Sequence, residues 1–174
     1  MKKYLLLTLS LLFASSFIPQ ASAQEFDGAV KARKAEMTLR AFNLGQLGAM
    51  AKGKVEYDAD AAKAAADNLK VLSSLNGMAM WPKGSDNVAL GDKTTALPAL
   101  WENFPKAVEA TKALSTAVDV LVGAAGKDLA SLQAAMGPVG AACGSCHKQF
   151  RQEQLRQSLW FRLLCLQPYF LLVA

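Results

Sequence analysis

Apolar residues recur every three or four positions along four stretches of this 174-residue sequence, and no stretch shows the alternation of a β-strand. The four stretches cover residues 26–51, 60–75, 98–124 and 129–150, and Asp128 stands where the last one needs an N-cap. Two of the three connections between them are short and one is long. This pattern predicts an all-α domain in the form of a four-helix bundle.

The long connection, residues 76–97, is rich in glycine, proline, aspartate and asparagine, which are typical of turns. Loops of this length within a compact domain are usually functional or packed against something large. Met78 and Trp81 are its expected apolar anchors. Farther along, Pro105 is expected either to kink the third helix or to mark its true start, and Pro138 is expected to kink the fourth.

The N-terminus has the layout of a secretory signal peptide, residues 1–23. Lys2 and Lys3 precede an uncharged apolar run that is short for a bilayer span, and Ala21-Ser22-Ala23 follows as a small-residue cleavage site. We therefore expect export to the periplasm with cleavage after Ala23 and a mature domain over residues 24–151. Loss of the two lysines lowers the formal net charge from +5 to +3, and the chain has no basic run, so binding to nucleic acid is not indicated.

The most specific motif is the pentapeptide Cys143-Gly144-Ser145-Cys146-His147, which has the C-x-x-C-H spacing of covalent c-type haem attachment. Each thiol adds to one vinyl group of the haem, and two positions three residues apart lie on the same face of a helix. His147 is the only histidine of the chain, and its ring is placed to bind the iron from one side. The small residues Gly144 and Ser145 allow the backbone to approach the haem edge.

Three other interpretations of the motif are weaker. A thioredoxin-like dithiol needs a βαβ setting with the first cysteine near a helix N-terminus, whereas Cys143 lies late in a helix of an all-helical chain. A structural zinc site, with Cys165 as a fourth ligand, would force the adjacent Cys146 and His147 into a cramped tetrahedron. A disulfide between adjacent turns of one helix forms poorly.

The chain resembles the class II c-type cytochromes, the cytochrome c′ family, in which the haem motif lies near the C-terminus. The resemblance spans residues 26–151. It rests chiefly on Cys143-x-x-Cys146-His147-x-x-Phe150-Arg151, with support from Val30-Lys31-x-Arg33-x-x-x-Met37, Lys52-Gly53, Tyr57-Asp58-Ala59, Pro82-x-Gly84-Ser85 and Ala99-Leu100-Trp101. It implies an antiparallel four-helix bundle with one haem c between the helices, attached through Cys143 and Cys146 on the last helix.

The resemblance also implies His147 as the fifth iron ligand and two alternatives for the sixth position. In high-spin members an apolar residue of the first helix blocks that position, and the iron binds NO or CO. In low-spin members a methionine of the first helix fills it, and Met37 falls at that place here. We expect Met37 to be the ligand, because His/Met ligation raises the reduction potential and suits electron transfer. In the alternative, Met37 is a core filler.

Other residues are less favoured as ligands or have an open role. Met50, Met78, Met80 and Met136 rank below Met37, and Met136 shares a helix with His147. In the family, a basic residue lies near the proximal imidazole at the place of Arg151. Arg33, one turn before Met37, is expected to pair with a haem propionate. For both arginines, a solvated surface charge is the alternative.

Residues 152–174 depart from the family, whose members usually end near the position of Arg151. The segment is strongly apolar, but Arg162 and Pro168 interrupt it and it is too short to span a bilayer well. We interpret it first as a frameshifted C-terminus; a membrane-surface or dimer-contact segment and a genuine cover of the haem edge are the alternatives. Cys165 would be an exposed free thiol in an exported protein, which favours the first interpretation.

These observations predict a periplasmic mono-haem cytochrome that carries electrons and is not an enzyme, with His147 and Met37 as axial ligands. Periplasmic or membrane-bound redox proteins are its expected partners, and the resemblance adds a homodimer through the first two helices. One alternative is a five-coordinate cytochrome c′ that binds NO or CO. The other is a thiol–disulfide oxidoreductase that uses Cys143 and Cys146.

Overall fold

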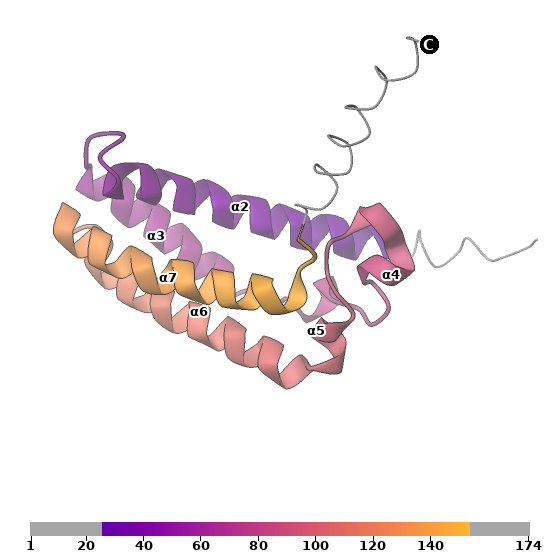
Figure 1. Cartoon of the computed structure of the whole chain (residues 1–174). Helices are drawn as coiled ribbons and strands as arrows, with labels where there is room; N and C mark the ends of the chain where they lie inside the picture. Colours follow the sequence, from indigo (N-terminus) through magenta and orange to yellow (C-terminus); the bar gives the residue numbers. More distant parts are fainter. Residues whose placement is uncertain (1–25, 154–174) are drawn as a thin grey trace, which may run out of the picture.

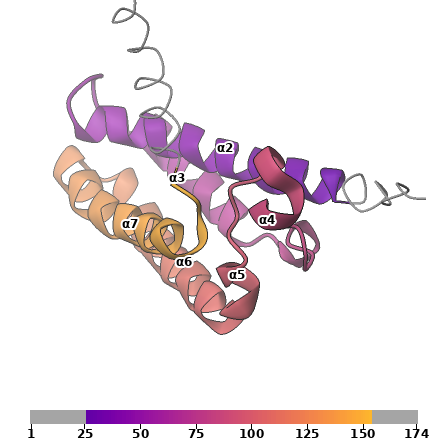
Figure 2. The same ribbon diagram turned by 45° about the vertical axis from the view of Figure 1, so that its right-hand side comes forward.

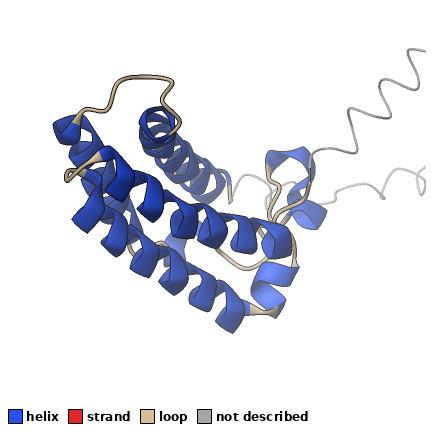
Figure 3. Ribbon diagram, turned by 60° about the vertical axis from the view of Figure 1, so that its left-hand side comes forward, coloured by secondary structure: helices blue, strands red, loops and turns tan. Residues whose placement is uncertain are grey.

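The computed structural model describes residues 26–153. Four long helices form the bundle: α2 (Asp27–Ala51), α3 (Ala59–Ser73), α6 (Phe104–Ala125) and α7 (Leu129–Phe150). They run antiparallel to one another in chain order, and α7 returns to pack against α2 (Figure 1). Among the described residues, the elements are helices joined by loops, without a strand (Figure 3). The predicted all-α four-helix bundle is confirmed.

Local chemistry explains where the helices begin. Asp58 and Asp128 cap α3 and α7, and their carboxylates accept hydrogen bonds from the backbone N–H groups of Ala61 (2.9 Å) and Ser131 (2.7 Å). Pro105 lies in the first turn of α6, where a missing N–H is harmless. The predicted third helix is therefore two pieces, α5 (Ala99–Glu102) and α6, while α7 continues through Pro138 to its end.

The hydrophobic core fills one half of the bundle. Its residues come from the C-terminal halves of α2 and α6 and the N-terminal parts of α3 and α7, which meet at the same end of an antiparallel bundle. They are Leu47, Met50, Ala62, Ala65, Ala66, Leu69, Ala117, Val118, Leu121, Ala125, Leu132, Ala135 and Val139. The other half of the bundle contains the ends of the helices on which the predicted site residues lie.

The periodicity of the first helix predicts an apolar face made of Val30, Met37, Ala41, Leu44 and Gly48. The structure shows that this face is partly wrong. Met37 and Ala41 are exposed, whereas Arg33, Asn43 and Leu47 are buried. Alanine and glycine occur on several sides of this helix, so the pattern of apolar residues does not define a single face. Asn43 faces inward because it has a polar partner on α3: its side-chain oxygen accepts a hydrogen bond of 3.0 Å from the side-chain amide of Asn68.

The predicted long loop contains three short helices, η1 (Met78–Met80), α4 (Asn87–Leu90) and η2 (Gly91–Lys93). It lies across one end of the bundle, beside the start of α2 and the end of α7 (Figures 1 and 2). Trp81 is half-buried, as expected of an anchor, but Met78 is exposed. The loop thus covers the half of the bundle in which the core residues are missing. Across residues 26–153, none of the helices combines the length and the apolarity that crossing a membrane demands.

Candidate functional site

The second half of the bundle contains the predicted site residues, and the main hydrophobic core does not extend into it. Buried apolar residues are fewer there, among them Val30 and Phe150. Met37 on α2 is 40% exposed, and Phe104 and Val108 in the first turns of α6 are each 36% exposed. Every buried residue of α6 lies from Ala117 onward, in the other half. An apolar group that lies among these exposed side chains would bury their surface and so be held there. A haem has the required chemistry, so the surroundings fit it.

Cys143 and Cys146 lie one turn apart near the end of α7, and both are free thiols. Cys143 packs against the hydrophobic core. Burial raises the pKa of the Cys143 thiol, although the positive charge of Arg40 on α2 opposes this, and burial together with Cys143 raises the pKa of Cys146. A redox-active dithiol needs a lowered pKa, so these surroundings do not favour a thiol–disulfide oxidoreductase.

His147 occupies the last turn of α7, one turn after Cys143. The residue is exposed, but the burial that its imidazole does have lowers its pKa below the usual value of 6.5, and the positive charge of Arg151 lowers the pKa further. The ring is therefore neutral at pH 7, which leaves a nitrogen lone pair to bind iron. Within residues 26–153, no three histidine, cysteine or acidic side chains gather as a site for a bare metal ion. Cys165, the fourth ligand of the zinc alternative, lies outside the described residues.

Arg33 is only 3% exposed, and the long loop holds its guanidinium. Nη1 donates to the Ser85 hydroxyl (2.7 Å) and to the Met80 carbonyl (3.4 Å), while Nη2 donates to the Ser85 carbonyl (2.5 Å) and the Thr94 hydroxyl (2.8 Å). The Trp81 ring lies against the same group, 4.7 Å from ring centre to guanidinium carbon. Arg33 is therefore not a solvated surface charge, and a pairing with a haem propionate stays a prediction.

Arg151 follows α7 directly, in extended conformation. Its backbone N–H donates to the carbonyl of His147 (3.0 Å), and it forms an isolated antiparallel bridge with Ala96 of the long loop. The side chain is exposed, but its charge acts on His147. The role of Arg151 beside the proximal imidazole stays a prediction.

Arg40 lies near the attachment motif, where its charge acts on Cys143, and the sequence analysis did not single it out. It lies on the same stripe of α2 as Arg33 and Met37, and its guanidinium binds Glu36 (2.7 and 3.0 Å). It also donates to the Ser73 hydroxyl and the Leu72 carbonyl at the end of α3. The signal in the sequence was the pair of arginines three and four residues from Met37 on one side of the helix, because charged side chains are rarely buried without partners.

Comparison with known proteins matches residues 28–151 to the model of the cytochrome c′ family. This chain belongs to the cytochrome c′ family. It is 43% identical over 131 residues to cytochrome c-554 from Cereibacter sphaeroides, which covers 75% of this chain and 85% of that relative. A solved cytochrome c′ from Rhodobacter has a TM-score of 0.72 at 36% identity and covers 74% of this chain and 98% of its own. A nitric oxide complex of a cytochrome c′ variant from Alcaligenes xylosoxidans has a TM-score of 0.64 at 34% identity, covering 74% and 97%.

As a member of the cytochrome c′ family, the protein carries covalent haem c through a cysteine pair. Members of this family are haem proteins and not classical enzymes. Cys143 and Cys146 are the cysteines among the described residues. The predicted signal peptide, its cleavage site and nearly all of the atypical tail lie outside the described residues.

Proposed function

We propose that this cytochrome c′ family member carries electrons through a six-coordinate haem held in the second half of the bundle. Cys143 and Cys146 attach the haem, His147 is the fifth ligand and Met37 is the sixth. The observation that carries the proposal is that the main hydrophobic core does not extend into this half of the bundle. This half lies between the end of α7, which carries the attachment motif, and the first part of α2, which carries Met37. Bound there, the haem supplies one-electron chemistry, and the bundle excludes water from it.

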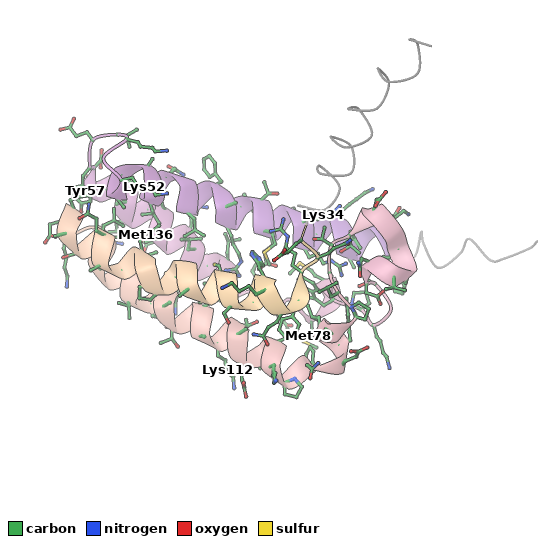
Figure 4. All side chains as sticks on the ribbon, viewed as in Figure 1. Lys34, Lys52, Tyr57, Met78, Lys112 and Met136 are labelled. Carbon is green, nitrogen blue, oxygen red and sulfur yellow. The ribbon has the colours of Figure 1, made fainter. Side chains whose placement is uncertain are left out.

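Met37 is the best placed methionine for the sixth position. Met50 is buried in the core at the opposite end, and Met136 lies on α7, the same helix as His147. Met78 and Met80 belong to the long loop, and Met78 is exposed. Figure 4 places Met136 and Met78 at opposite ends of the molecule. A thioether from α2 and a neutral imidazole from α7 favour the reduced iron and so raise the potential.

Gas binding is the second candidate function. A variant of the related cytochrome c′ from Alcaligenes xylosoxidans has been solved as a nitric oxide complex, and this chain shares its fold. A five-coordinate iron with Met37 turned aside would leave the sixth position free for NO or CO. The partial exposure of Met37 is compatible with that arrangement.

A homodimer has support from an exposed apolar surface on α2 and the turn that follows it. Leu39, Phe42 and Val55 are exposed, and a shallow hollow at this place is lined mostly by apolar residues, with Gln46, Glu56 and Asp58 among its polar ones. Apolar patches of this kind are typical of protein contacts. For the other partners, we infer periplasmic or membrane-bound redox proteins, because the N-terminal residues predict export to the periplasm.

The absorption spectrum of the haem-loaded protein separates the two candidate functions. We expect a sharp low-spin α band after reduction, and we expect addition of CO to leave it in place. A broad high-spin spectrum that shifts with CO would contradict Met37 ligation and make gas binding the leading function. Complete absence of haem absorption would contradict both.

A further inference from the structure

The last residues of the long loop connect the helix of Met37 with the helix of His147. We call residues 94–97 the strap. On one side, the buried hydroxyl of Thr94 accepts a hydrogen bond of 2.8 Å from Arg33, which lies one turn before Met37 on α2. The same hydroxyl accepts from the backbone N–H of Ala96 (3.2 Å), so the strap is fixed internally where it meets α2.

On the other side, the strap is joined to the end of α7 by backbone hydrogen bonds. The N–H of Leu97 donates to the carbonyl of Phe150 (2.9 Å), and the N–H of Gln152 donates to the carbonyl of Thr95 (2.8 Å). These two bonds enclose the antiparallel bridge between Ala96 and Arg151. His147 lies one turn earlier on the same helix. Four consecutive residues thus contact both ligand-bearing helices.

The rest of the loop reinforces the connection to α2. Ser85 is completely buried and binds the Arg33 guanidinium through both its hydroxyl and its carbonyl. Trp81 covers the same guanidinium, and Trp101 donates from its indole N–H to the Trp81 carbonyl (3.1 Å). Because a buried guanidinium without these acceptors would carry a large desolvation cost, Arg33 and the loop hold each other in place.

We propose that the strap is a positioning element that keeps Met37 within reach of the haem iron. This inference rests on the proposed function, since it takes Met37 as the sixth ligand. The main hydrophobic core does not reach the first half of α2, where Val30 is the one buried apolar residue. The strap therefore adds a restraint where packing against α7 is limited. Loosening it raises the fraction of molecules in which the Met37 side chain has left the iron, and CO then gains access in proportion to that fraction.

The test uses the haem-loaded full chain and three variants. Thr94→Val removes a hydroxyl of the strap, and Ser85→Ala removes a hydroxyl from the part of the loop that reinforces it at Arg33, each with little change of shape. Tyr57→Phe is the matched control, because the Tyr57 hydroxyl also makes one long-range hydrogen bond, to the Ala125 carbonyl (2.8 Å), but at the opposite end of the bundle (Figure 4). The measured quantities are the rate of CO binding to the reduced protein and the hydrogen exchange of the backbone amides.

We expect CO to bind about tenfold faster to the Thr94→Val and Ser85→Ala proteins than to the wild type, which corresponds to about 1.4 kcal/mol. Tyr57→Phe is expected to match the wild type. Equal rates in all three variants would overturn the proposal. Ready binding of CO to the wild type would contradict Met37 as the sixth ligand, independently of the proposal about the strap.

If the wild-type protein binds CO readily, hydrogen exchange still tests whether the strap couples the two helices. The strap predicts faster exchange in Thr94→Val both in the first turns of α2 and at Arg151 and Gln152, beyond the end of α7, and in neither place in Tyr57→Phe. Faster exchange in α2 alone would show that residues 94–97 do not couple the two helices, and would overturn the proposal.

Discussion

Two arginines on α2 differ in burial and in their bonding partners, and each is held in place by the residues around it. Arg33 is buried without a carboxylate bonded to it, and burial lowers the pKa of its guanidinium, although Asp86 opposes the shift. It stays charged, because even a lowered arginine pKa lies far above neutrality. Arg40 instead pairs with Glu36 and lies near Cys143. Met37 lies between these two fixed cations, so polar contacts contribute much of what holds its section of α2, beside the buried side chain of Val30.

At the scale of the helix, α7 carries the attachment motif at one end and its cap at the other. The Asp128 carboxylate accepts a hydrogen bond from the backbone N–H of Ser131, and this bond, with a further one from the Ser131 side chain, lowers the pKa of Asp128. A carboxylate with a lowered pKa stabilises the fold above its unfolded pKa of about 3.8, and this stabilisation is lost as the pH falls through the folded value. The cap is far from the site, so its effect is on stability alone.

We predict that Asp128→Ala lowers the melting temperature by a few degrees at pH 7, because α7 loses its N-terminal cap. The difference from the wild type should shrink as the pH is lowered through the range in which Asp128 takes up its proton. Thermal unfolding followed by circular dichroism from pH 7 to pH 3 measures this. The exposed Asp92→Ala serves as the control; a difference that stays constant with pH would contradict the capping argument.

The helices themselves were predictable, because their periodicity, the cap at Asp128 and the start at Pro105 are local properties of the sequence. The attachment motif was predictable for the same reason. The partners of Arg33 were not, because Ser85 and Thr94 lie more than 50 residues away and are brought to it by the path of the loop. The inward face of α2 was misjudged since its alanines and glycines fit either side of a helix.

At the scale of the whole molecule, the bundle has a packed half and a half that depends on its cofactor. The packed half holds side chains such as Leu47, Leu121 and Leu132, which are completely buried. The second half is held by the strap, by polar contacts of α2 and by the haem that the family carries. Haem binding and folding are thus coupled in one half of the molecule more than in the other.

We predict that a double variant, Cys143→Ala with Cys146→Ala, folds only in part when it is produced without attached haem. Amides near Leu47 and Leu121 should keep their protection from hydrogen exchange, while those of the first turns of α2 and α6 lose it, because burial of the haem is missing there. Unfolding should also occur at a lower denaturant concentration. Uniform protection along all four helices would contradict the division of the bundle into two halves.

The most direct test of the account is the visible spectrum of the reduced, haem-loaded protein compared with that of Met37→Ala. Met78→Ala is the control, because it removes an exposed methionine of the long loop. We predict a sharp low-spin α band in the wild type and in Met78→Ala, and a broad high-spin spectrum that shifts with CO in Met37→Ala. A Met37→Ala spectrum identical to that of the wild type would show that Met37 does not bind the iron.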